Sequence, residues 1–207
     1  SKNKNITFFS GYDCDSLALE NITGFASHIL PLFRDNPLAL LEFRTKSIQI
    51  KPLDKITPID NCIMAYSLMP DKMSLELDKK APTIKRRIST IKKLSEMGWK
   101  IGLRFDPLIY GKNWKDYYRE LHEEIYSSLN LNTVHSISYG PLRFPSAMYN
   151  KIFDLYPEEK LFTGPFEQNN KVISYKKEVE EEMTDYCQSI SLKHLPKSII
   201  FKCNYEN

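Results

Sequence analysis

The chain alternates between short apolar runs and longer segments in which apolar residues recur with the period of a helix. Five runs have the length and composition of β-strands: ITFF (6–9), LALLEFRT (38–45), CIMAYSL (62–68), KIGLRFD (100–106) and VHSISYG (134–140). Several of them are nearly continuous apolar stretches, which is typical of parallel strands covered on both faces. Strands that alternate with helices indicate βαβ units, so we predict an α/β fold with a parallel sheet.

Three segments between these runs have one apolar helical face. The faces consist of Leu19, Ile22, Phe25, Ala26, Ile29 and Phe33; of Ile84, Ile88, Ile91 and Leu94; and, within 113–128, of Trp114, Tyr117, Leu121 and Ile125. In the second segment the run KRR at 85–87 falls largely on the opposite face and is expected in solvent, although it could also help to hold a nucleic-acid backbone. Gly98 is expected to end that helix.

The number of strands limits the architecture. Right-handed crossovers curl such a sheet towards a barrel, but five runs are too few for a closed eight-stranded one. We therefore expect residues 1–207 to form one domain with part of a barrel in 1–170. In 171–207 we expect a helix from Tyr175 to about Ile190 and a short terminal strand, IIFKCNY (199–205).

Composition and charge fit a protein of the cytoplasm. The 207 residues are 42% hydrophobic and 27% charged, and the net charge of +3 is too small to indicate nucleic-acid binding by itself. No run approaches the roughly 18 apolar residues of a membrane span. The opening SKNKN is not followed by the apolar core of a signal peptide. Four widely spaced cysteines without a CxxC pair argue against a zinc site or a disulfide framework.

Polar residues follow each predicted strand, at the edge where parallel α/β folds build their active sites. They are Gly11 to Ser16, Arg44 to Lys46, Ser67, Asp106, and Tyr139 to Arg143. Any one of them is more often a solvated loop residue, but five clusters at one sheet edge predict a functional site. Lys46 suits a carboxylate or phosphate ligand as a point charge.

Cys14 stands between two acids, Asp13 and Asp15. These neighbours are expected to raise the pKa of the thiol, which disfavours a thiolate nucleophile. A lone cysteine is most often a small core residue. A thiol that gives up a hydrogen atom needs no thiolate, so that role stays open for Cys14.

A series of motifs resembles the spore photoproduct lyase family of radical S-adenosylmethionine (AdoMet) proteins, and its lyase-like DNA repair photolyase group in particular. The motifs are GxxxDSLALE, LLEFRTKS, IMAYSL, PTIKRRISTIKKLSEMGWKIGLRFDPLIY with GxxWKDYYRE, and SYGPLRFPS. They occur in order from Phe8 to about Tyr186. The resemblance implies a partial (β/α)6 barrel with AdoMet and a 4Fe–4S cluster. It also implies a carbon–carbon lyase in which a 5′-deoxyadenosyl radical abstracts hydrogen from a thymine photoproduct in DNA.

The resemblance also implies roles for individual residues. Lys46, Ser67, Asp15 and Asp106 correspond to cofactor-binding positions, and Tyr139 and Arg143 to the substrate side of the site. The hydrogen donor of the lyase aligns with Tyr12. Cys14 lies two residues further and would point to the same side of an extended segment. Either Tyr12 or Cys14 could serve as the donor, or neither.

The family's cluster motif, CxxxCxxC, is absent from this sequence. Three thiolates are needed to hold the protein-ligated irons, so no metal ligand is assigned here. In the family the motif lies upstream of Phe8, in the loop after the first barrel strand. We therefore expect that strand and the cluster on an N-terminal segment or a partner chain. Two alternatives remain: a radical AdoMet enzyme for another substrate, and a cluster-less binding module.

Overall fold

Six parallel strands form the main sheet of the computed structural model, which describes residues 6–11 and 14–203. The order is β1-β2-β3-β4-β5-β9, and all neighbouring pairs are parallel. The bounds are β1 Ile6–Ser10, β2 Ala39–Thr45, β3 Cys62–Ser67, β4 Lys100–Leu108, β5 Val134–Pro141 and β9 Ile200–Lys202. The five predicted strands are confirmed, and the terminal strand joins the same sheet. The predicted residues 204 and 205 lie outside the described part.

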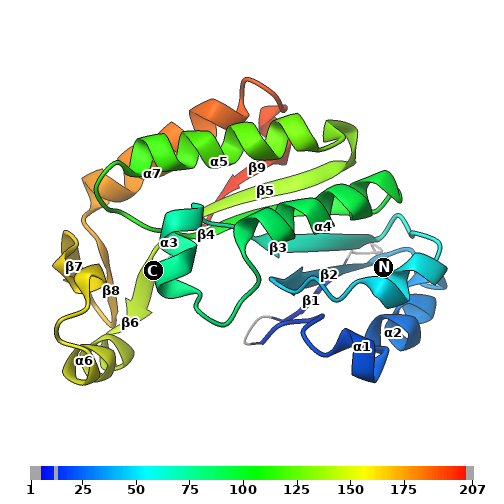
Figure 1. Ribbon diagram of the computed structural model, residues 1–207, viewed down its shortest axis with the longest axis horizontal. Helices are drawn as coiled ribbons and strands as arrows, with labels where there is room; N and C mark the ends of the chain where they lie inside the picture. Colours follow the sequence, from blue (N-terminus) through cyan, green and yellow to red (C-terminus); the bar gives the residue numbers. More distant parts are fainter. Residues whose placement is uncertain (1–5, 12–13, 204–207) are drawn as a thin grey trace, which may run out of the picture.

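Helices cover one face of the sheet, which is curled into a half-barrel (Figure 1). They are α1 Glu20–Thr23, α2 Phe25–Arg34, α3 Asp71–Leu77, α4 Ile84–Glu96, α5 Trp114–Ser128 and α7 Lys177–Ser191. Single 3₁₀ turns occupy Lys51–Lys55, Leu131–Thr133, Lys160–Thr163 and Lys197–Ile199. Gly98 has a φ of 94° just beyond α4, as predicted for a residue that ends a helix. Within the described ranges no helix is long and apolar enough to cross a membrane.

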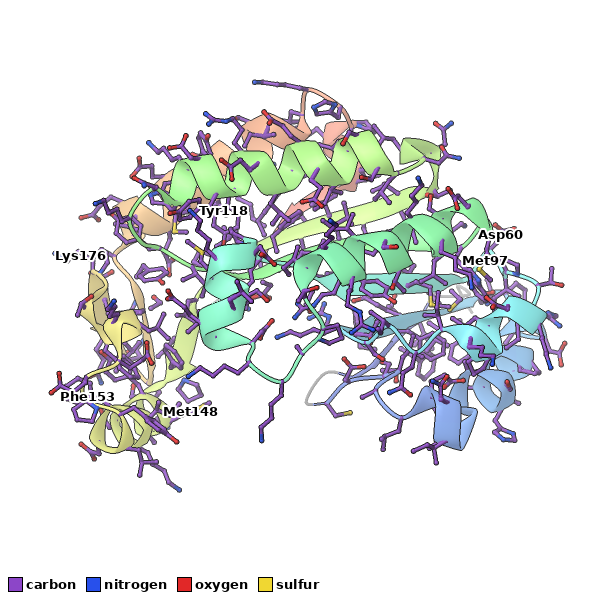
Figure 2. All side chains as sticks on the ribbon, viewed as in Figure 1. Asp60, Met97, Tyr118, Met148, Phe153 and Lys176 are labelled. Carbon is purple, nitrogen blue, oxygen red and sulfur yellow. The ribbon has the colours of Figure 1, made fainter. Side chains whose placement is uncertain are left out.

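A small antiparallel sheet extends from one end of the half-barrel. Strands β6 Arg143–Pro145, β8 Val172–Tyr175 and β7 Phe166–Asn169 pair in that order, and α6 Ser146–Leu155 packs beside them. Figure 2 shows Met148 and Phe153 on this helix, far from Asp60 and Met97. This sheet was not predicted from the sequence. Its strands of three or four residues are too short to show an apolar period.

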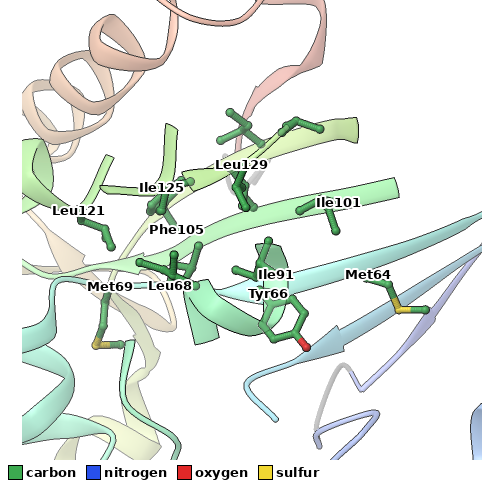
Figure 3. Packing of buried hydrophobic residues seen from close by; sticks show 14 of the residues in the cluster. Met64, Tyr66, Leu68, Met69, Ile91, Ile101, Phe105, Leu121, Ile125 and Leu129 are labelled. Atoms are coloured by element: carbon green, nitrogen blue, oxygen red, sulfur yellow. The ribbon is translucent and has the colours of Figure 1, made fainter. Parts of the chain in front are cut away.

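The main core lies between the sheet and its helices (Figure 3). Tyr66 and Phe105 from the strands and Ile125 from α5 are fully buried there. Tyr118 is also fully buried, whereas Tyr117, which the sequence analysis placed in the apolar stripe of α5, is only partly buried. The Tyr118 hydroxyl accepts a hydrogen bond from the backbone N–H of Ile109 at 2.8 Å. This bond satisfies the hydroxyl inside the core.

The strands present a different chemistry on their other, concave face. Side chains alternate between the two faces of a strand, so Phe43 of β2 faces the helices while Glu42 and Arg44 face the concave side. Arg104 of β4 joins the same face through its contact with Glu42. The C-terminal strand ends and the concave face together position the site.

Candidate functional site

Asp15 ties the loop after β1 to the end of β2. Its Oδ1 accepts hydrogen bonds from the Leu17 backbone N–H at 2.9 Å and the Thr45 hydroxyl at 2.6 Å. Its Oδ2 accepts the Lys46 backbone N–H at 2.7 Å. The two polar clusters predicted at neighbouring strand ends therefore meet directly. A carboxylate has about four lone-pair sites, so Asp15 retains acceptor capacity for a ligand hydroxyl.

Lys46 reaches from β2 to Asp78, between α3 and α4. Lys46 Nζ lies 2.6 Å from Asp78 Oδ1, and Arg87 Nη2 lies 2.9 Å from Asp78 Oδ2. Burial raises the pKa of Asp78, but hydrogen bonds from Lys46 and Arg87 outweigh it and hold this pKa below its ordinary value. Lys46, Asp78 and Arg87 thus form a triad of charged groups. Beside this triad is a cavity of about 740 Å³, whose lining includes Asp15, Lys46, Gln49, Asp78 and Pro82.

Arg87 corrects the prediction that the KRR run is solvated. Its side chain is completely buried, and besides Asp78 it donates to the carbonyl oxygens of Ser67 at 3.0 Å and Pro82 at 2.8 Å. Helical periodicity placed Arg87 on a polar face, because a local pattern does not show its ion pair with Asp78, which lies 9 residues earlier. Arg87 thus fixes the end of β3 at the site.

A charged network covers the floor of the concave face. Glu42 accepts two hydrogen bonds from Arg104, at 2.7 and 3.2 Å, and two from Arg44, at 3.1 and 3.3 Å. Burial raises the pKa of Glu42, but the two guanidinium groups outweigh it and lower the pKa overall. Gly102 gives Arg104 its space, since a Cβ there would lie 2.8 Å from Arg104 Nη2.

Asp106, near the end of β4, and Arg143, the first residue of β6, form an ion pair with two N–O distances of 3.2 Å. Cys203, just after β9, lies near this pair. Burial raises the pKa of its thiol and Asp106 adds to the rise, while Ser138, Arg143 and Arg44 act in the opposite direction. The thiol is therefore protonated at neutral pH. No sequence pattern indicates a role for Cys203, because only the docking of β9 beside β5 brings it to the site.

Comparison with known proteins identifies the family. A family model described as spore photoproduct lyase matches residues 1–201. The chain belongs to the spore photoproduct lyase family. No curated protein matches it closely enough to be counted as a relative.

Solved structures of spore photoproduct lyase share the fold. One is complexed with dinucleoside spore photoproduct, and another, a mutant, has bound AdoMet and the same dinucleoside. Each aligns with a TM-score of 0.83 and 15% sequence identity over 100% of this chain. The chain spans 63% of the length of either protein. The half-barrel is therefore the partial barrel of the spore photoproduct lyase family.

The structure brings together most of the predicted site residues. Asp15, Lys46, Asp106 and Arg143 lie at one edge of the sheet, and the Ser67 carbonyl is held there by Arg87. Cys14 is exposed at the same edge. Tyr12 lies outside the described residues, so its alignment with the lyase hydrogen donor stays a prediction.

Tyr139 is a correction, since its side chain is completely buried on the helix side of β5. The hydroxyl is hydrogen-bonded to His122 Nε2 at 2.9 Å and to Ser191 Oγ at 2.5 Å. Strand alternation explains this placement: Tyr139 points into the core while its neighbours Ser138 and Gly140 face the concave side. Tyr139 is a core residue rather than a substrate contact.

The site fits the two cofactors that the sequence resemblance implies differently. Lys46 and Asp15 line the 740 Å³ cavity. The Lys46 ammonium group suits the methionyl carboxylate of AdoMet, and the Asp15 carboxylate can accept a hydrogen bond from a ribose hydroxyl. For the iron–sulfur cluster the described residues do not fit, because they contain no group of histidines, cysteines or acids able to hold a metal. Cys62 and Cys187 are buried in the core, apart from the sheet edge where Cys14 and Cys203 lie.

One substitution tests the architecture of this edge. A Cβ on Gly140 would lie 2.8 Å from Arg143 Nη1 and 2.9 Å from Asp106. We expect Gly140→Ala to displace the ion pair and to lower the free energy of unfolding by about 0.5–1 kcal/mol, measured by denaturant titration, because the atoms that must move are the ends of flexible, partly exposed side chains. Gly111→Ala is the matched control, because its nearest neighbour, Met73 Cε, is 4.0 Å away. Equal stability of the two variants would contradict the crowding at Gly140.

Proposed function

We propose that this chain is the larger part of a radical AdoMet lyase that repairs thymine photoproducts in DNA by splitting the carbon–carbon bond between two thymines. The observation that carries the proposal is the convergence of Asp15, Lys46, Asp106 and Arg143 at one edge of a family-typical half-barrel. The family match over residues 1–201 supports the reaction class. The binding of AdoMet and dinucleoside spore photoproduct by a structural relative supports the choice of ligands.

Bound AdoMet would supply hydrogen-atom abstraction, and the chain's own residues would hold and orient it. Lys46 would offer its ammonium group to the methionyl carboxylate, and Asp78 would keep that ammonium in place. Asp15 would accept a hydrogen bond from a ribose hydroxyl. Its three existing bonds to the loop and to β2 fix the carboxylate before the ligand arrives.

The substrate would lie on the concave face, close to Arg143 and Asp106. Two cysteine thiols flank this region, Cys14 after β1 and Cys203 after β9. A protonated thiol can return a hydrogen atom to a product radical, so Cys203 joins Cys14 and Tyr12 as a candidate donor. The cluster would come from a segment or partner chain that carries the CxxxCxxC motif.

The proposal is tested with this chain together with the segment or partner chain that carries the CxxxCxxC motif. The cluster is reconstituted first, and AdoMet, a reductant and an oligonucleotide that contains the photoproduct are then added anaerobically. We expect restored thymines and 5′-deoxyadenosine in the product mixture.

Lys46→Met should weaken AdoMet binding about 10- to 100-fold, because a charge-assisted hydrogen bond is lost. Lys51→Met, at an exposed position outside the cavity lining, is the matched control. Binding of AdoMet without repair of the oligonucleotide would point to a different substrate, and no binding of AdoMet would refute the enzyme proposal.

A further inference from the structure

The charged floor of the concave face contains more positive charge than its own carboxylate can balance. Glu42 is 3% exposed and receives all the ion pairs that Arg44 and Arg104 make within the described residues. Two guanidinium groups against one carboxylate leave one positive charge. Thymine bases carry no charge at neutral pH, so the bases alone would not neutralise this excess.

The two arginines are not equivalent. Arg104 is 5% exposed, and all three of its guanidinium nitrogens are used: they donate to Glu42, to the Ser136 carbonyl and hydroxyl, and to the Leu103 carbonyl. Arg104 therefore has no N–H group left to donate to a ligand. Its role is to hold Glu42 against the floor of the sheet.

Arg44 retains the capacity that Arg104 lacks. Its Nε and Nη2 donate to Glu42 Oε1, no hydrogen bond from its Nη1 occurs among the described residues, and its side chain is 28% exposed. Arg44 is the last residue but one of β2 and precedes Lys46 by two residues. A guanidinium group held along one edge by a carboxylate can present its free N–H groups to an anionic oxygen.

We propose that Arg44 binds the phosphate that links the two nucleotides of the substrate, while Glu42 and Arg104 hold its guanidinium group in place. The choice of a nucleotide phosphate rests on the proposed function, whereas the capacity of Arg44 to bind an anionic oxygen rests on the network alone. The carboxylate of AdoMet offers the same oxygen chemistry, so the experiment must separate the two sources.

The first test compares two forms of the photoproduct, the dinucleotide with its bridging phosphate and the dinucleoside without it. Wild-type protein should bind the dinucleotide more tightly. Arg44→Gln should lose about 10- to 100-fold in affinity for the dinucleotide and keep its affinity for the dinucleoside and for AdoMet. Arg86→Gln, on the exposed side of α4, is the matched control. Equal losses for both forms, no loss for either, or a loss confined to AdoMet would overturn the proposal.

The second test does not depend on the photoproduct. Both Arg44 and Arg143 act on the Cys203 thiol, so Cys203 reports the charge in this region. Inorganic phosphate bound at Arg44 should slow alkylation of Cys203 at fixed pH, measured by peptide mass spectrometry. The effect of phosphate should disappear in Arg44→Gln and persist in Arg86→Gln. An unchanged phosphate effect in Arg44→Gln would refute the role of Arg44 even if the protein repairs no photoproduct.

Discussion

Replacing Glu42 with glutamine is expected to lower the free energy of unfolding by about 3–5 kcal/mol, because the substitution leaves Arg104 buried without its counter-charge. Glu42 is 3% exposed and Arg104 is 5% exposed, so water cannot take the place of the lost carboxylate. Glutamine keeps the shape of the side chain, but it removes the charge and replaces one of the two acceptor oxygens with an NH2 donor that faces a guanidinium group. Denaturant titration of both proteins at pH 7 measures the difference.

Two further variants separate the charge effect from general damage. Glu96→Gln removes an exposed carboxylate on α4, whose pair with Lys92 spans 3.9 Å, and should change stability by less than about 1 kcal/mol. Combining Glu42→Leu with Arg104→Leu should recover part of the loss, because a buried pair can often be replaced by apolar residues. A Glu42→Gln protein as stable as Glu96→Gln would contradict the buried network.

The pH dependence of stability provides an independent check on Glu42. Its pKa is lowered in the folded protein, so its contribution is fully present above the ordinary glutamate pKa of about 4.3. The contribution is lost as the pH falls through the folded value. The stability of Glu42→Gln should therefore depend less on pH in this acidic window than that of the wild type.

Replacing Arg87 with methionine is expected to cost a similar amount, about 3–5 kcal/mol, and to weaken AdoMet binding as well. The guanidinium group is completely buried and joins Asp78, the Ser67 carbonyl and the Pro82 carbonyl. Methionine would leave both carbonyls without their donor and Asp78 with Lys46 alone. Thermal or denaturant unfolding measures the first effect, and equilibrium dialysis of AdoMet measures the second.

Arg86→Met is a close control, since it removes the same side chain from the exposed position next to Arg87 on the same helix. It should leave both measurements within experimental error of the wild type. Arg87→Lys should fall between the two, because an ammonium group keeps the charge but lacks the planar set of donors that reaches three acceptors. Similar effects of Arg86→Met and Arg87→Met would show that the ion pair of Arg87 with Asp78 does not hold the site.

Much of the fold could be predicted from local patterns. The five apolar runs became β1 to β5, and the clusters after them meet at one edge because parallel strands place their C-terminal ends together. Strand alternation also explains the error at Tyr139. The residue stands at a strand end, as the rule requires, but its side chain belongs to the face that packs against α5 and α7. The rule that active sites form at the C-terminal ends of parallel strands does not say on which face of the sheet a side chain lies.

The sequence by itself determined the order of the strands and helices, the parallel sheet and the edge that bears the site, because apolar periodicity records which local face is buried. Only the tertiary structure decided which charges meet: Glu42 and Arg104 are 62 residues apart, and Asp15 and Lys46 are 31 apart. It also decided that Arg87 is buried and that Cys203 lies near Arg143. Such pairings depend on the curvature of the sheet and the docking of β9, which bring distant segments together, and no local pattern encodes them.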